Sequence, residues 1–388
     1  MSNKPRFVGE KVRLGDVCKA SSLRNKDESC NTVYSVTNSQ GFVPSEEYFS
    51  KEVYSKELKT YRVVDRDMIA YNPSRINVGS VALQNKAERV VVSPLYVVFS
   101  TDSSRLLPDY LVQFLKSKPG LDQIAFQSIG TVRNNLKFKA MCQMELTLPS
   151  VEAQRKRLQK LDSICGQINH AKETIEKLDQ LIKSRFVEMF GLYVKDGDFS
   201  ELSELCEFVT VGIANAATHA YSDDGVVMLR NLNVRENKLD DSDLIRIKPE
   251  FAAKYAKKSL KTGDVLVTRT GYPGIACVVP EKYSGCQTFT TLIARLKDDA
   301  PVIPLFLSYW INSPSGKEFV ARMKAGSSQQ NFGATSLKLM PVPLPSLELQ
   351  QEFAAFVSQV DKLRSVAQQQ IEKLQMLYDS LAQDYFGD

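Results

Sequence analysis

Histidine and paired cysteines are scarce in this chain, and their scarcity limits the kinds of site it can build. Its 388 residues include two histidines, His170 and His219, and seven cysteines, with no C-x-x-C pair among them. Zinc sites use closely spaced Cys and His ligands, and general acid–base catalysis most often uses His. We therefore expect neither a zinc site nor a His-based catalytic centre, and we expect His170 to lie on a helix surface.

Long apolar runs are also absent. No stretch of eighteen apolar residues occurs, and the N-terminal region lacks the apolar core of a secretory signal. An odd number of cysteines without a pairing pattern is typical of a reducing compartment. We therefore expect a cytoplasmic protein that does not span a membrane.

Charge of one sign does not dominate, since 50 Lys and Arg residues face 45 Asp and Glu residues, for a net charge of +5. The pI of about 8.6 permits nucleic-acid binding without requiring it, so any basic surface has to be local. The length is sufficient for two domains of ordinary size, each with its own core.

The familiar catalytic motifs are missing as well. The chain has no G-x-x-x-x-G-K-[ST] phosphate loop and no complete G-x-G-x-x-G turn. Asn72-Pro73 lacks the second proline and the aromatic residue of an adenine methyltransferase loop, and the turn at residues 270–274 does not form a phosphate cradle. The acidic pair Asp223-Asp224 lies in a polar loop, without the strand and lysine of a metal-dependent nuclease. We expect no catalytic residues in this chain.

One long segment, residues 151–189, carries a heptad pattern. Apolar residues recur at seven-residue intervals: Leu161, Ile168, Ile175, Ile182 and Met189. This spacing predicts one long helix with a coiled-coil seam. Ser150 is suited to cap its N-terminus, and Gly191 is expected to end it.

The segment has a counterpart near the C-terminus. Adding 196 to each residue number aligns the two segments without a gap. Leu148-Pro149-Ser150 then matches Leu344-Pro345-Ser346, and Phe190-Gly191 matches Phe386-Gly387. The second segment has its own heptad rows, interrupted by Arg364. Two seams of equal length in one chain predict two helices that pack antiparallel, related by a pseudo-two-fold axis.

The regions before the two predicted helices also repeat. Residues 1–147 mix short β-rich runs with turns and a helix that begins at Pro108 and is expected to end near Pro119-Gly120; residues 192–343 follow the same order. We therefore predict an α+β fold with an internal duplication. The predicted segments are a domain at 1–149, a long helix at 150–191, a second domain at 192–345 and a second long helix at 346–388.

Polar loops on the two domains supply donors suited to base edges and phosphates. Candidate DNA-binding residues in the first domain are Arg24, Asn25, Lys26, Arg75, Asn77, Arg133, Asn134 and Asn135. Those in the second domain are His219, Arg230, Asn231, Arg235, Arg269, Thr270, Ser327, Ser328, Gln329, Gln330 and Asn331. Each residue alone is weak evidence, because many surface loops contain such side chains.

Together these features resemble the specificity subunit of type I restriction-modification enzymes. The resemblance rests first on motifs that occur in both halves: Leu-Pro-Ser followed by Glu-x-Gln at each helix start, Ile-Glu-Lys-Leu within each helix and Phe-Gly at each helix end. It rests also on the strand at residues 265–269 and on the loop Gly-Ser-Ser-Gln-Gln-Asn-Phe at residues 326–332. It covers essentially the whole chain.

The resemblance implies a non-enzymatic subunit with two target-recognition domains, separated by two long conserved helices that form an antiparallel coiled coil. Each domain is expected to read one half of a bipartite double-stranded DNA target. The expected partners are two methyltransferase subunits and nuclease-translocase subunits, which would carry S-adenosylmethionine, ATP and Mg; this chain would hold no cofactor. Two alternatives remain: a DNA methyltransferase with an unrecognised site, and an architectural coiled-coil adaptor without DNA binding.

Overall fold

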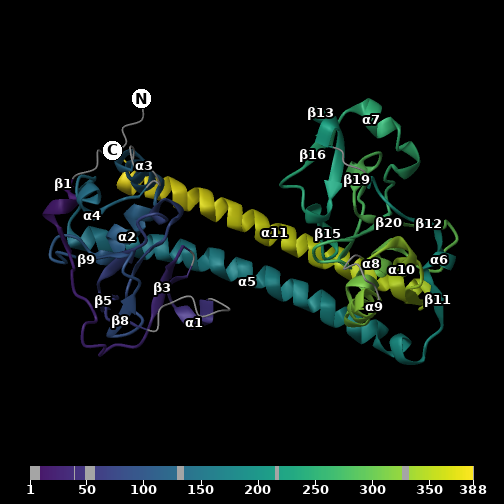
Figure 1. Cartoon of the computed structure of the whole chain (residues 1–388), viewed down its shortest axis with the longest axis horizontal. Helices are drawn as coiled ribbons and strands as arrows, with labels where there is room; N and C mark the ends of the chain where they lie inside the picture. The colour runs from purple at the N-terminus through teal and green to yellow at the C-terminus, as the bar shows by residue number, and fades with distance from the viewer. Residues whose placement is uncertain are drawn as a thin grey trace. The chain divides into compact units, whose positions relative to one another are not determined.

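The computed structural model describes residues 9–38, 40–48, 57–128, 135–214, 218–325 and 332–387. They divide into two compact units: Met1–Glu173 with Ala367–Asp388, and Thr174–Val366. Each unit contains one globular domain and one half of each long helix, α5 (Val151–Asp196) and α11 (Leu347–Phe386) (Figure 1). Within the described ranges, no helix has both the length and the apolar character needed to cross a membrane.

The two long helices begin as the sequence predicts. The Ser150 hydroxyl oxygen accepts a hydrogen bond from the Ala153 amide at 3.3 Å, and that of Ser346 accepts one from the Leu349 amide at 3.3 Å. α5 has 46 residues and α11 has 40. At 1.5 Å per residue they are about 69 and 60 Å long.

The predicted end of the first helix is wrong. α5 continues through Gly191 to Asp196. A glycine ends a helix when it takes a left-handed conformation, and Gly191 is not among the residues with positive φ. A helical glycine is tolerated at a cost of about 1 kcal/mol relative to alanine. The second helix does end at Phe386, directly before Gly387.

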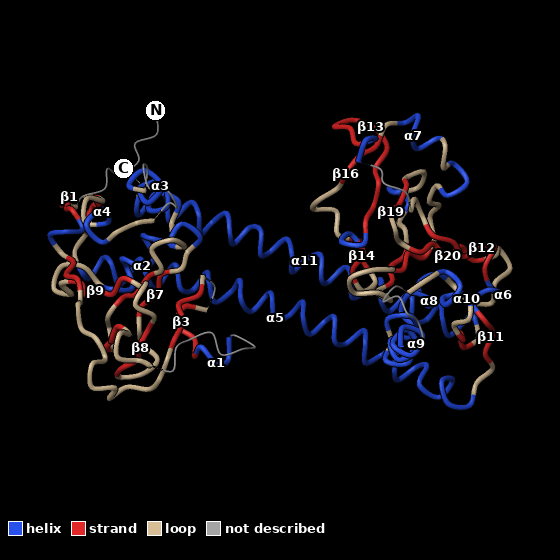
Figure 2. The backbone as a smooth tube through the Cα atoms, viewed as in Figure 1, coloured by secondary structure: helices blue, strands red, loops and turns tan. Residues whose placement is uncertain are grey.

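The first domain is built on a four-stranded sheet of order β2-β9-β6-β7, which is antiparallel throughout. Figure 2 shows the strands of this domain in red, with β7 and β9 labelled. Its strands are β1 (Glu10–Arg13), β2 (Cys18–Ala20), β3 (Tyr34–Thr37), β4 (Gly41–Pro44), β5 (Arg62–Asp65), β6 (Ile69–Tyr71), β7 (Val81–Leu83), β8 (Arg89–Val92), β9 (Val97–Thr101) and β10 (Glu145–Leu148). Its helices are η1 (Leu14–Asp16), α1 (Ser45–Tyr48), η2 (Ile76–Val78), α2 (Pro108–Lys116), α3 (Lys118–Gln127) and α4 (Phe138–Met141). The short β-rich runs that the sequence shows in this region include β6, β7, β8 and β9.

The second domain repeats this sheet as β12-β20-β17-β18 and also contains a three-stranded sheet, β16-β13-β19, where the first domain has the two-stranded sheets β3-β4 and β5-β8. Its strands are β11 (Phe199–Glu201), β12 (Cys206–Val211), β13 (Tyr221–Arg230), β14 (Val234–Arg235), β15 (Lys238–Leu239), β16 (Ile245–Ile247), β17 (Val265–Val267), β18 (Ala276–Val278), β19 (Gln287–Phe289), β20 (Leu292–Leu296) and β21 (Pro341–Pro343). Its helices are α6 (Leu202–Leu205), η3 (Thr218–Ala220), η4 (Asn231–Asn233), α7 (Pro249–Ala253), η5 (Ala256–Lys258), η6 (Glu281–Tyr283), α8 (Pro304–Asn312), α9 (Pro314–Ala325) and α10 (Ala334–Lys338).

A helix that the sequence pattern missed follows α2. Pro119-Gly120 was expected to end the helical region, but these residues form the first turn of α3. The hydroxyl of Ser117 accepts a hydrogen bond from the Gly120 amide at 3.3 Å and caps the new helix. A Cβ on Gly120 would lie 2.0 Å from the Phe114 carbonyl oxygen, so only glycine permits this close helix–helix turn.

The duplication extends to individual hydrogen bonds. The Leu14 amide donates to the Met144 carbonyl at 2.9 Å, and the Leu202 amide donates to the Met340 carbonyl at 2.9 Å. The side chain of Gln154 is fully buried and joins α5 to the first domain: it accepts from the Leu107 amide at 2.9 Å and donates to the carbonyls of Arg105 and Pro149. Gln350 makes the same three bonds, to Ile303, Pro301 and Pro345.

Gln154→Leu is expected to destabilise the first unit. The change leaves the Leu107 amide and two carbonyls without their partner, and each buried polar group left unsatisfied costs about 1–3 kcal/mol. The measurement is the thermal unfolding midpoint. Gln159→Leu, at an exposed position of the same helix, is the matched control. Equal midpoints for both variants would mean that this glutamine does not hold the helix to the domain.

Each unit holds the two long helices antiparallel. In the second unit, Arg185 of α5 pairs with Glu352 of α11 at 3.0 Å, and Asp179 pairs with Arg364, so α5 numbers fall as α11 numbers rise. Aromatic residues anchor the helix ends: Phe190 lies 4.9 Å from Phe306 of α8 between ring centroids. In the first unit, Phe386 lies 5.0 Å from Tyr110 of α2. The end of each long helix therefore packs in the unit whose domain precedes the other long helix.

Candidate nucleic-acid interface

Two loops occupy the same place in the two central sheets and carry several of the candidate residues. The first, which we call L1, is residues 72–80 and joins β6 to β7; the second, L2, is residues 268–275 and joins β17 to β18. L1 contains Arg75 and Asn77, and both are exposed. L2 contains Arg269 and Thr270, and both are half-buried.

Each loop is held by the segment that runs back toward the long helix. The Leu136 amide donates to the Pro73 carbonyl at 3.0 Å, which places the exposed Asn135 beside L1. The Phe332 amide donates to the Arg269 carbonyl at 3.2 Å in the second unit. Shifting Leu136 and Pro73 by 196 gives Phe332 and Arg269, so the two bonds are equivalent. Within each unit, the loop is therefore bonded to the equivalent segment before a long helix.

L2 gains a third candidate from another part of the second domain. The side-chain nitrogen of Asn231 (Nδ2) donates to the Thr270 hydroxyl at 2.6 Å, and the side-chain oxygen (Oδ1) accepts from the Arg269 backbone amide at 3.4 Å. Asn231 also approaches the Thr290 hydroxyl at 3.5 Å. Asn231, Arg269 and Thr270 therefore form one cluster. Because the Asn231 amide is engaged in these bonds, its role is to position the loop.

The two arginines keep their donors available. The guanidinium groups of Arg75 and Arg269 make no hydrogen bond or ion pair with any residue that the structure describes. A guanidinium carries five N–H donors in a planar fork that matches guanine edges and phosphates. These two side chains are the strongest candidates for DNA contact.

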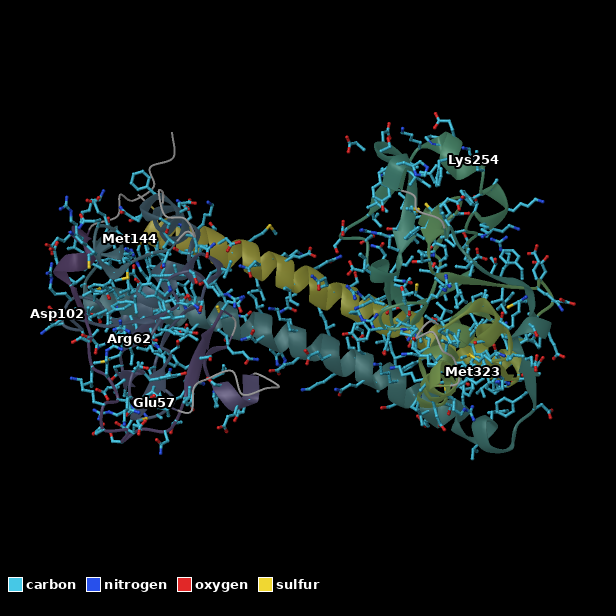
Figure 3. All side chains as sticks on the ribbon, viewed as in Figure 1. Glu57, Arg62, Asp102, Met144, Lys254 and Met323 are labelled. Atoms are coloured by element: carbon cyan, nitrogen blue, oxygen red, sulfur yellow. The ribbon has the colours of Figure 1, made fainter. Side chains whose placement is uncertain are left out.

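The candidates at residues 24–26 behave differently. Asn25 is buried, donates to the Cys30 carbonyl at 2.7 Å and accepts from the Cys30 amide at 3.1 Å, so its side chain closes a loop. The prediction of Asn25 as a DNA-binding residue is therefore wrong, because its buried side chain is not available to DNA. Arg24 and Lys26 are exposed, and Arg24 donates to the Thr60 carbonyl at 2.7 Å. The backbone of Arg24 forms an isolated antiparallel β-bridge with that of Arg62, which is labelled in Figure 3. Burial and the charge of Arg24 lower the pKa of Arg62.

Three candidates of the second domain are already engaged with neighbours. Arg230 donates to the carboxylate of Asp243 at 2.8 Å, and Arg235 pairs with Asp240 at 3.3 Å. The exposed His219 ring forms a T-shaped pair with the Phe251 ring, with centroids 5.3 Å apart. The carboxylates weaken the attraction of both arginines for phosphate, so these positions are weaker candidates than Arg75 and Arg269.

Seven further candidates lie outside the described residues. They are Arg133 and Asn134 in the first domain and Ser327, Ser328, Gln329, Gln330 and Asn331 in the second. Their roles remain predictions from the sequence.

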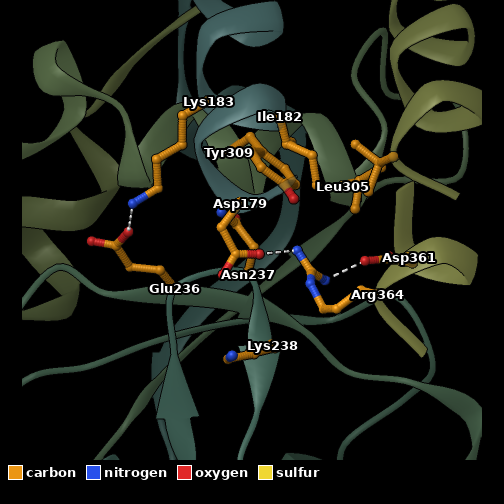
Figure 4. Close-up of a pocket in the computed structure, with 11 residues that line it drawn as sticks. Asp179, Ile182, Lys183, Glu236, Asn237, Lys238, Leu305, Tyr309, Asp361 and Arg364 are labelled. Carbon is orange, nitrogen blue, oxygen red and sulfur yellow. Dashed lines mark hydrogen bonds and ion pairs between the residues drawn. The ribbon is translucent and has the colours of Figure 1, made fainter. Parts of the chain in front are cut away.

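A polar network attaches the hairpin of β14 and β15 to the helices of the second unit (Figure 4). Glu236 pairs with Lys183 of α5 at 2.8 Å and with Lys317 of α9 at 2.5 Å. Burial alone would raise the pKa of Glu236, but hydrogen bonds from both lysines lower it. The network therefore orients the hairpin on α5.

Arg364, which interrupts the heptad row of α11, has a partner-based explanation. Its guanidinium pairs with Asp179 of α5 and with Asp361 of α11 (Figure 4). Burial and the nearby Asp179 raise the pKa of Asp361, while Arg364 opposes that rise. A charged residue at a seam position is tolerated because both carboxylates face it.

Comparison with known proteins agrees with this duplicated arrangement. A family model described as the type I restriction modification DNA specificity domain matches twice, at residues 9–180 and 195–376. The chain belongs to this family. The two matches correspond to the two halves of the duplication, each with one domain and most of the long helix that follows it.

Individual members of the specificity family are distant relatives. The EcoBI specificity subunit of Escherichia coli is 23% identical over 300 residues, covering 70% of this chain and 63% of that protein. The StySPI specificity subunit of Salmonella potsdam is 25% identical over 292 residues, covering 71% of this chain and 63% of that protein. The matched regions therefore span less than two thirds of either relative.

Two solved structures share the fold of this specificity-family chain. One is a chain from a structural study of complex assembly and conformational transition in a type I R-M system, with a TM-score of 0.61, 16% identity and 97% coverage of both chains. The other is the S subunit of a type I restriction-modification system from M. genitalium, with a TM-score of 0.54, 12% identity and coverage of 100% of this chain and 98% of that one.

Proposed function

We propose that this chain is the DNA-specificity subunit of a type I restriction-modification system. The first domain reads one half of a bipartite double-stranded DNA target and the second domain reads the other half. The paired helices α5 and α11 set the unspecified spacer between the halves. The site residues on which this proposal rests most heavily are Arg75 and Asn77 in L1 and Arg269 and Thr270 in L2.

The matched position of L1 and L2 is the observation that carries this proposal. Both loops join the equivalent pair of strands in equivalent sheets, and both bond to the segment before a long helix. Each carries an arginine whose side-chain donors have no partner among the described residues. Two domains that share a fold but differ in the sequence of this loop suit a DNA target with two different halves. An adaptor without DNA binding would have no need of such loops.

The catalytic steps are proposed to belong to partner subunits. Two methyltransferase subunits would dock on the duplicated scaffold, since a pseudo-two-fold arrangement offers two similar faces to identical partners. Nuclease-translocase subunits would join them. S-adenosylmethionine, ATP and Mg would bind to these partners, and the specificity subunit would supply only the DNA sequence preference.

The purified chain alone is expected neither to methylate nor to cleave DNA. Adding methyltransferase subunits should produce transfer of labelled methyl groups to duplexes of one defined sequence, and the methyltransferase subunits without this chain should not show that preference. Transfer by the lone chain would favour the alternative of a methyltransferase with an unrecognised site. Unselective transfer by the assembled complex would contradict the specificity role.

A further inference from the structure

An exposed aromatic side chain stands in L2, next to the cluster of Asn231, Arg269 and Thr270. Tyr272 exposes 85% of its surface, more than any other large apolar side chain of the described residues. The sequence pattern identified residues 270–274 only as a turn and did not single out this tyrosine. Its flanking residues, Gly271 and Pro273, were the available signal, because they mark a shaped turn that presents one side chain.

L2 holds Tyr272 in a defined place. The Thr268 hydroxyl donates to the Tyr272 carbonyl at 2.7 Å and accepts from the Ile275 amide at 2.9 Å. The Thr268 carbonyl accepts from the Gly274 amide at 3.0 Å. Gly271 and Gly274 have φ of +73° and +90°, a region in which most side chains are strained. Three hydrogen bonds therefore constrain the loop backbone around Tyr272, which reduces the backbone entropy lost when the loop binds a partner.

The base of L2 packs closely against the domain, whereas its tip has free space around it. A Cβ on Gly274 would lie 2.8 Å from the Val320 side chain of α9, so the loop backbone packs directly on that helix. A Cβ on Gly271 would meet nothing within 4 Å. The tyrosine thus projects from a supported base into open space, without a neighbouring atom of L2 crowding the tip.

Its surroundings favour a polyanion as the partner. The Arg269 guanidinium has no partner among the described residues, and the hydroxyl of the following residue, Thr270, accepts a hydrogen bond from the Asn231 side chain and can still donate one. An exposed aromatic ring and an unpaired guanidinium three residues apart in one loop suit a groove of DNA, where phosphates meet the cation and the ring packs on base edges and sugars. An apolar protein surface would leave the Arg269 charge without a complement.

We propose that Tyr272 is a DNA contact of the second domain, packing its ring within the half-site that this domain reads. The inference rests on the proposed function and adds to it a contact residue that acts through its ring. An aromatic side chain has about 150–250 Å² to bury, and burying roughly a quarter to a half of it against sugars and base edges at about 25 cal/mol per Å² gives about 1–3 kcal/mol, or roughly 5- to 150-fold in affinity.

Binding measurements on the complex with methyltransferase subunits give the first test. Tyr272→Ala is expected to weaken binding of the selected duplex by roughly 5- to 150-fold, because the apolar surface of the ring is no longer buried. Tyr272→Phe should retain most of the affinity, because it keeps the ring. Tyr221→Ala, at another exposed tyrosine of the second domain that lies on β13, is the matched control and should bind as the wild type does. Equal unfolding midpoints for all variants establish that the fold is intact.

Photo-crosslinking gives the second test. With p-benzoylphenylalanine at position 272, irradiation of the same complex should crosslink to DNA within one half-site. Crosslinking to a methyltransferase subunit, or unchanged affinity in Tyr272→Ala, would overturn the assignment while leaving the proposed function in place. If the wild-type complex prefers no DNA sequence, the proposed function and the Tyr272 contact both fail.

Discussion

Lengthening both long helices by four residues is expected to add about one to two base pairs to the unspecified spacer of the DNA target. The insertions are placed after Lys172 in α5 and after Gln368 in α11, so the antiparallel pair stays in step. Four residues add roughly 6 Å at 1.5 Å per residue, and DNA advances about 3.4 Å per base pair. The two half-sites should not change, because no residue of either domain is altered. The measurement is selection of bound duplexes from a random pool.

The structure supplies a reason for inserting in both helices. Residue pairs such as Asp179 with Arg364 and Arg185 with Glu352 hold α5 and α11 in one antiparallel register. An insertion in α5 alone shifts that register and is expected to lower the unfolding midpoint, which makes it the control for the double insertion. Recovery of the original spacer by a stable, doubly lengthened protein would mean that the helices do not set the distance.

Replacing one arginine in each matched loop is expected to relax one half-site at a time. Arg75→Ala should reduce discrimination only in the half read by the first domain, and Arg269→Ala only in the half read by the second. A lost bidentate contact to a base costs roughly 1–3 kcal/mol of discrimination. The measurement is the relative affinity for duplexes with single substitutions at every target position.

Each arginine variant is the control for the other, because each removes one guanidinium and the two loops, L1 and L2, are equivalent. Loss of discrimination in both half-sites by either variant would indicate a structural role. A uniform loss of affinity without a change in discrimination would assign the guanidinium to phosphate contact, and the salt dependence of binding should then decrease by about one counterion.

The duplicated scaffold could be predicted from the sequence because its signals are local and repeated. Heptad spacing identifies the long helices, and an ungapped shift of 196 positions predicts matched contacts such as those of Gln154 and Gln350. The end of α5 was mispredicted at Gly191 because a glycine can remain helical where no left-handed turn forms. Arg364 interrupts the pattern for a tertiary reason, its two carboxylate partners.

The grouping of the candidate site residues could not be predicted in the same way. The bond between Leu136 and Pro73 joins residues far apart in the chain, and the contact of Asn231 with Thr270 depends on how η4 and L2 meet. Sequence spacing carries no information on either contact. The same limit explains why Asn25 was included and Tyr272 omitted: residue type suggested the first, and only burial and exposure separate their roles.

Selection of duplexes by the wild-type complex tests the central claim most directly. The complex of this chain with methyltransferase subunits is incubated with a random duplex pool, and bound DNA is sequenced after repeated rounds. Two domains that each read one half predict two short specified segments, different from one another, at a constant separation whose own sequence is free. A single continuous specified segment, or bound DNA with no shared sequence, would contradict the account.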